Sequence, residues 1–177
     1  MRPVVVTAIL LLVVLMFISD SAAWNPEQMC REKYHSVPCR NQIRGKGWFQ
    51  MGDRCLKAFY HNKHPNFQDA ENICRKYGGN LVSIHNIVEL CQVECIMWRT
   101  SRDKAHYWIG LHKTPERRLH YTWTDGSGNT DGWTHWAWGQ PDIMAREHCI
   151  EMNYWDWGLW NNVDCMKGRP YVCAMKA

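Results

Sequence analysis

The sequence predicts an α+β domain with a largely antiparallel sheet, stapled by disulfides. Two helical patterns come early, between residues 66 and 98, and short runs rich in tryptophan and β-branched residues follow from residue 107. Segregation of helices and strands along a chain is typical of α+β folds. Nine cysteines are the third observation, because small exported domains use disulfides to stabilise a limited core.

Residues 1–23 have the pattern of a secretory signal peptide. Arg2 precedes an apolar run from Val4 to Ile18, and small residues then lead to Ala23. A membrane-spanning helix needs about 20 apolar residues. This run is shorter and no comparable run follows, so we expect a secreted, extracellular chain with no membrane insertion.

Residues 24–44 are predicted to form an N-terminal extension, and residues 45–177 the domain. The extension is polar, carries Cys30 and Cys39, and shows no sustained periodicity. The mature length suits one domain. Within it, a first strand runs from Gly47 to Leu56, interrupted by a turn at residues 52–53.

The strongest helix pattern begins at an Asn66 N-cap and ends at the glycine pair 78–79. One face would carry Phe67, Ala70, Ile73, Cys74 and Tyr77. After a short strand at residues 81–84, a second helix is predicted from Asn86. Its apolar side would carry Ile87, Leu90, Cys91, Met97 and Trp98.

The second half of the chain predicts short strands separated by turns. The strands are expected at residues 108–111, 121–124, 149–154 and 171–174. Turn or loop residues lie between them at 126–129, 139–142 and 157–158.

The composition argues against several functional classes. The net charge is +4 with scattered basic residues, so no nucleic-acid partner is expected. The sequence contains no Cys-x-x-Cys pair of the kind that binds zinc. It also contains neither the His-Glu-x-x-His motif nor the Gly-x-Ser-x-Gly motif of known enzyme classes. Binding is therefore favoured over catalysis.

Several motifs together resemble the C-type lectin-like family over about 130 residues, from Gly45 to Lys176. They occur in the family's order: GWF at 47–49 ahead of Cys55, AENIC at 70–74, GNLVSI at 79–84, WIGL at 108–111, QPD at 140–142, Cys149, WNNVDC at 160–165 and YVC at 171–173.

The resemblance implies a disulfide pattern that the spacing does not establish. Cys74 would pair with Cys173, Cys149 with Cys165, and Cys39 with Cys55. Cys30, Cys91 and Cys95 have no place in this pattern. One of the three is left over, either as a buried or capped thiol or as the link in a disulfide-bonded homodimer.

The resemblance also implies one calcium ion as cofactor, held by side-chain oxygens from two loops. The matching positions are Gln140, Asp142, Glu147, Asn161 and Asn162. Calcium accepts six to eight such oxygens, and two sugar hydroxyls would complete its coordination. Asn162 departs from the family pattern, which has aspartate there, and this leaves only two anionic ligands.

The Gln-Pro-Asp order resembles the family's galactose-selecting form, so galactose-type glycans or glycoproteins are the expected partners. Gln140, Asp142, Glu147 and Asn161 would contact the sugar, and Trp155 or Trp157 would stack on it. The alternative is a calcium-independent protein-binding module that uses the tryptophan-rich stretch from residue 133 to 160.

Overall fold

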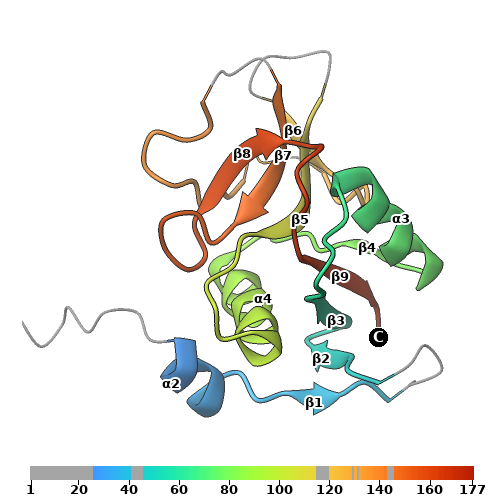
Figure 1. Ribbon diagram of the computed structural model, residues 1–177. Helices are drawn as coiled ribbons and strands as arrows, with labels where there is room; N and C mark the ends of the chain where they lie inside the picture. The colour runs from blue at the N-terminus through green and yellow to red at the C-terminus, as the bar shows by residue number, and fades with distance from the viewer. Residues whose placement is uncertain (1–25, 41–45, 115–119, 129, 131, 143–145) are drawn as a thin grey trace, which may run out of the picture.

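The computed structural model describes residues 26–40, 46–114, 120–128, 130, 132–142 and 146–177 (Figure 1). The predicted signal peptide lies outside these residues. Within the described ranges, none of the helices has the length and apolar character needed to cross a membrane.

The predicted first strand is a hairpin of β2 (Phe49–Met51) and β3 (Arg54–Phe59). Gly52 has a φ of 63°, a left-handed conformation that glycine adopts without strain, and it makes the predicted turn. In register, Phe49 pairs with Leu56 and Met51 with Arg54.

Both predicted helices begin at the expected asparagine caps. In α3 (Phe67–Lys76) the side chain of Asn66 accepts a hydrogen bond from the Asp69 amide, and in α4 (Ile87–Thr100) Asn86 accepts one from Glu89. These bonds satisfy amides that lack a partner within the helix. The predicted apolar face of α4 is partly wrong, because Ile87 in the first turn is 54% exposed.

The sheet is largely antiparallel, as predicted. Its order is β1-β2-β3-β9-β5-β7-β8, with β4 beside β9 and β6 beside β5. Among the strand pairs of the described residues, only β5–β9 is parallel. The other strands are β1 (Val37–Pro38), β4 (Asn80–Leu81), β5 (Tyr107–Lys113), β6 (Tyr121–Trp123), β7 (Glu147–Met152), β8 (Trp160–Asp164) and β9 (Tyr171–Lys176).

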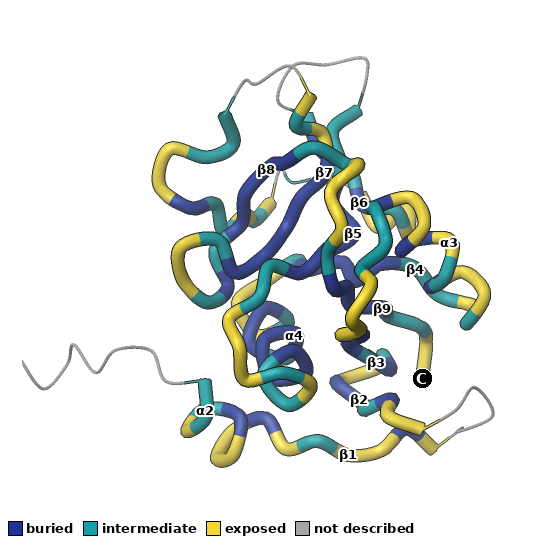
Figure 2. The backbone as a smooth tube through the Cα atoms, viewed as in Figure 1, coloured by how far each residue is buried: buried dark blue, intermediate teal, exposed yellow. Residues whose placement is uncertain are grey.

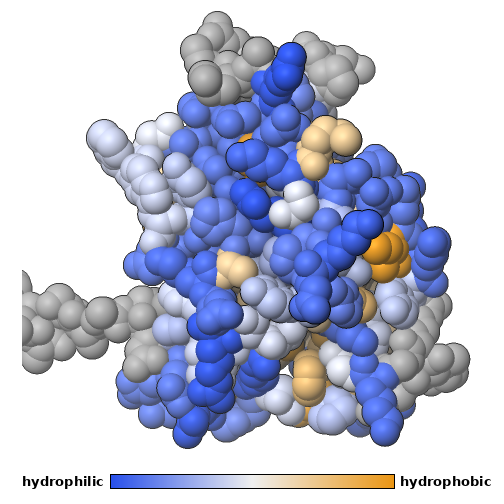
Figure 3. Space-filling view, in the orientation of Figure 1, coloured by the Kyte–Doolittle hydropathy of each residue, from blue (hydrophilic) through white to orange (hydrophobic). Residues whose placement is uncertain are grey.

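Two cores lie on opposite faces of this sheet. Successive residues of β5 point to opposite faces, so that Ile109 packs in the core under α4 and Trp108 packs in the core under α3. Figure 2 shows β5, β7 and the inner side of α4 as buried, with exposed segments around them. The face seen in Figure 3 is mostly hydrophilic, with small separate apolar spots.

The N-terminal extension folds onto the domain. A short helix, α2 (Pro26–Glu32), packs against α4, and the Arg99 guanidinium donates to the carbonyls of Cys30 (2.6 Å) and Tyr34 (2.5 Å). The sequence does not predict α2, because seven residues are too few for a clear helical period.

Eight of the nine cysteines form four disulfides. The three implied pairs, Cys74–Cys173, Cys149–Cys165 and Cys39–Cys55, are confirmed, and Cys30–Cys95 is a fourth. Cys91 is left over, and burial raises the pKa of its thiol, as does the charge of Glu94. Its position fits a buried thiol, whereas a disulfide-linked homodimer stays a prediction that would require Cys91 to become exposed.

Candidate functional site

The β7–β8 hairpin and the loop before it carry the predicted calcium ligands. Glu147 begins β7, and its neighbouring strand β8 contains Asn161 and Asn162. The Cys149–Cys165 disulfide ties the start of β7 to the residue after β8. The Gln140–Pro141 peptide, which opens the loop, is cis.

Asn162 holds this loop together through both ends of its amide. Its Oδ1 accepts from the Asp142 backbone amide at 2.9 Å, and its Nδ2 lies 3.1 Å from the Asp142 carbonyl and 3.3 Å from the Glu147 carbonyl. Nδ2 also lies 3.2 Å from Oδ1 of Asp142, and Gln140 Oε1 accepts from the Asp142 amide at 3.0 Å. The structure therefore gathers Gln140, Asp142, Glu147 and Asn162.

Asn161 is held differently, by a buried carboxylate. Its Nδ2 donates to Oε1 of Glu151 at 3.0 Å, across the β7–β8 pair. The Arg169 Nε donates to the other oxygen of Glu151 at 2.6 Å, and His106 Nδ1 lies 3.2 Å from Oε1. The motifs of the sequence do not include Glu151, although an acidic residue inside the apolar run 149–152 is a signal that could have indicated it.

Glu151 is only 1% exposed, yet the groups around it favour its ionised form. Burial alone would raise its pKa, but the hydrogen bonds from His106, Arg169 and Asn161 and the charge of Arg169 lower the pKa below its usual value. These contacts therefore stabilise a negative charge on Glu151, opposite Asn161 in the β7–β8 pair.

The two acidic residues of the loop crowd each other. Burial raises the pKa of Glu147 to about 6, together with a hydrogen bond to Asp142 and the charges of Asp142 and Glu151. A divalent cation would relieve this repulsion, because it would neutralise both carboxylates at once.

The donor set fits calcium by its chemistry. It consists of two carboxylates and three amides, all hard oxygen donors from two segments of chain. Among the described residues, no group of three or more histidine, cysteine, aspartate and glutamate side chains could hold a metal ion. The predicted carboxylate and amide oxygens are compatible with calcium by the chemistry of the donors alone.

The structure does not bring Trp155 and Trp157 to the loop. They lie in the turn at the far end of the β7–β8 hairpin. Met152, where β7 ends ahead of this turn, is already five residues from Glu147. At about 3.3 Å per residue, this separation is roughly 17 Å along the strand. Asn153, which donates to the Ala105 carbonyl at 3.1 Å, packs that turn against the segment after α4.

A different tryptophan is exposed beside the loop. Trp138 is 85% exposed and stands two residues before Gln140, in a turn closed by a hydrogen bond from the Gln140 amide to the Ala137 carbonyl (2.9 Å). Other tryptophans of this stretch pack inward, since the rings of Trp133 and Trp136 contact the buried Trp160 edge-on. Part of the tryptophan-rich stretch is thus core.

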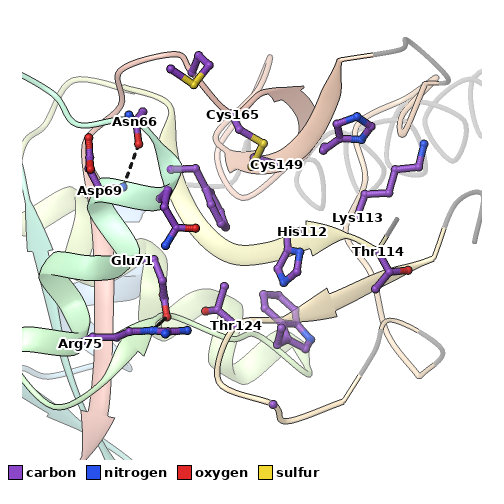
Figure 4. Close-up of a pocket in the computed structure, with 16 residues that line it drawn as sticks. Asn66, Asp69, Glu71, Arg75, His112, Lys113, Thr114, Thr124, Cys149 and Cys165 are labelled. Atoms are coloured by element: carbon purple, nitrogen blue, oxygen red, sulfur yellow. Dashed lines mark hydrogen bonds and ion pairs between the residues drawn. A yellow bond between two sulfur atoms is a disulfide. The ribbon is translucent and has the colours of Figure 1, made fainter. Parts of the chain in front are cut away.

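A separate cavity of about 830 Å³ lies between α3 and the end of β5. Figure 4 shows Glu71 and Arg75 on one side, His112 and Lys113 on the other, and the Cys149–Cys165 disulfide above. None of the five predicted calcium ligands lines it. The cavity is therefore distinct from the Gln140–Asp142 loop.

Comparisons with known proteins agree with the fold and the motifs. The model of the Lectin C-type domain matches residues 63–175. The galactose-specific lectin nattectin from Thalassophryne nattereri is 35% identical over 73% of this chain and 78% of its own, and a galactose-binding C-type lectin isoform from Pseudechis porphyriacus is 33% identical over 73% and 81%.

The structural comparison gives the same family. The C-type lectin CEL-I from Cucumaria echinata superposes with a TM-score of 0.65 at 28% identity, and the match covers 73% of this chain and 94% of that one. The residues that the family model matches include the Gln140–Asp142 loop and strands β7 and β8. The chain belongs to the C-type lectin domain family.

Proposed function

We propose that the protein is a secreted lectin that binds galactose-type glycans in a calcium-dependent way. The crowding of Asp142 and Glu147 carries this proposal, because two adjacent carboxylates on a partly buried loop favour a bound cation. The relatives named for galactose binding support the sugar class. Binding rather than catalysis follows from the same site.

Side-chain oxygens of Gln140, Asp142, Glu147, Asn161 and Asn162 would hold the ion. Bound calcium would leave coordination positions for two neighbouring sugar hydroxyls. The residues themselves would select the sugar: an amide at 140 and a carboxylate at 142 fix which edge donates and which accepts hydrogen bonds.

Trp138 would supply the stacking surface that the sequence predicts at Trp155 or Trp157. Galactose has an apolar face that packs on aromatic rings. Trp138 is exposed and adjoins Gln140, whereas Trp155 is exposed at the opposite end of the hairpin. Position therefore favours Trp138.

The disulfides support secretion. Four bridges are formed, and such bonds persist in oxidising compartments outside the cytosol. A signal peptide at residues 1–23 would deliver the chain there.

A second candidate is a calcium-independent binding module of the same fold. Asn162 favours it, because its amide already closes the loop by bonding Asp142 and the Glu147 carbonyl. In that case the loop keeps its shape without an ion, and its exposed surface, with Trp138, would meet a protein partner.

Chromatography on galactose and mannose resins, with and without a calcium chelator, separates the two candidates. The lectin proposal predicts retention on galactose alone and elution by chelator. Retention that ignores the chelator, or no retention on either resin, would contradict it and favour the second candidate.

A further inference from the structure

Glu151 is a buried acid whose role the loop ligands do not explain. It is 1% exposed in the middle of β7, where an ionised carboxylate is costly unless donors surround it. Three donors do so: Arg169 Nε at 2.6 Å, Asn161 Nδ2 at 3.0 Å and His106 Nδ1 at 3.2 Å. These contacts come from three separate segments of chain.

The chemistry of this contact fixes the orientation of the Asn161 amide. An amide has a donor end and an acceptor end, and a carboxylate oxygen only accepts. Asn161 must therefore turn Nδ2 toward Glu151 and Oδ1 away from it. The described residues supply no hydrogen bond to that Oδ1, which leaves the oxygen available.

The carboxylate is itself held firmly. Arg169 bonds Oε2 of Glu151 and also donates its backbone amide to the Pro65 carbonyl at 3.1 Å. Arg169 therefore anchors Glu151 from the segment that leads into β9. Asn161 is 7% exposed and has little room to rotate.

We propose that Glu151 is a positioning residue, which acts through Asn161 to point an oxygen rather than an NH₂ group at the calcium loop. This inference rests on the proposed function, since it gives Asn161 Oδ1 the part of a calcium ligand. Partners behind a metal ligand fix its orientation and tune affinity in this way. Glu151 thereby prepares one ligand before the ion arrives.

Calcium titration of Glu151→Gln by calorimetry tests the proposal. Glutamine can present either a donor or an acceptor to Asn161, so we expect about tenfold weaker calcium binding, the low end for partners behind a ligand. If Glu151 acts through Asn161, the double variant with Asn161→Ala will bind calcium no more weakly than Asn161→Ala alone. Independent, additive losses would overturn the proposal.

Glu71→Gln is a matched control. Glu71 is equally buried, at 2% exposed, and accepts from Arg75 Nε (2.8 Å), Asn80 Nδ2 (2.7 Å) and the Leu81 amide (2.8 Å), but it lies on α3 away from the loop. We expect a lower melting temperature with unchanged calcium affinity. Equal calcium losses in Glu71→Gln and Glu151→Gln would show mere destabilisation and sink the positioning role.

A calcium-free measurement separates this inference from the proposed function. Proton exchange of the Asn161 side-chain amide, followed by NMR, should be slow in the wild type and fast in Glu151→Gln. Rapid exchange in the wild type overturns the inference without need of a variant. If exchange is slow but the protein binds no calcium, the inferred orientation of the Asn161 amide stands and the proposed function is contradicted instead.

Discussion

The two ends of the β7–β8 hairpin carry very different groups. At one end, Asp142 and Glu147 crowd each other near the Cys149–Cys165 disulfide. At the other end, the exposed Trp155 lies in a turn that packs on the segment after α4. A tryptophan count alone would favour the second end for binding. The placement of charge favours the first end, because the proposed calcium site needs the paired carboxylates of Asp142 and Glu147.

The largest expected effect is the loss of calcium binding in Asp142→Ala. This variant removes one of the two anionic ligands, together with the carboxylate oxygen that lies 3.2 Å from Asn162 Nδ2. We therefore expect the calcium affinity to fall by more than about 100-fold, roughly 2.7 kcal/mol. Calorimetry with calcium measures it. The same substitution at Asp156, in the turn at the other end, should leave calcium binding intact; equal losses would erase the distinction between the ends.

Acidification should weaken calcium binding below about pH 6. The pKa of Glu147 is raised to about 6, so protons compete with the ion there, and affinity falls by up to about tenfold per pH unit. The calcium-free protein has the opposite sign, since a raised carboxyl pKa adds stability as pH falls through 6. Calcium titrations from pH 5 to 8 would show the trend, and a flat profile would remove Glu147 from the ligand set.

Asn162→Asp should strengthen calcium binding by about tenfold. The variant adds a third carboxylate to the loop and loses the amide donor that bonds the Asp142 and Glu147 carbonyls. Without calcium, the variant should therefore melt at a lower temperature than the wild type. Unchanged calcium affinity would mean that Asn162 serves the loop's shape alone.

The smallest effect is expected for the exposed tryptophans. Trp138→Ala should weaken galactose binding several-fold, corresponding to about 1 kcal/mol for one stacked ring, with calcium affinity unaltered. Trp155→Ala is its matched control at the opposite end and should bind galactose as the wild type does. A larger loss of galactose affinity in Trp155→Ala than in Trp138→Ala would instead assign the stacking role to Trp155.

Local chemistry in the sequence was sufficient for much of the fold. Asn66 and Asn86 were recognised as caps because a polar residue ahead of an apolar period has a direct hydrogen-bonding role. The three implied disulfides depended on the family resemblance, because spacing does not define pairing. The sequence does not predict strand β8, because Asn161 and Asn162 make this buried strand look polar.

The site was only partly predictable for a related reason. Which residues supply oxygens can be inferred from motifs, but where they point depends on register across β7 and β8. Register places Glu151 opposite Asn161 and carries the turn of Trp155 away from the loop. An alternation with a period of two residues predicts which face a side chain occupies, but it does not identify the residue opposite it on the neighbouring strand.

Calcium calorimetry of the intact protein at neutral pH tests the central claim most directly. The account predicts a single site with a dissociation constant near or below about 1 mM, within the range of extracellular calcium modules. Absence of binding heat at several times that concentration, in a protein with its Cys149–Cys165 bridge formed, would contradict it.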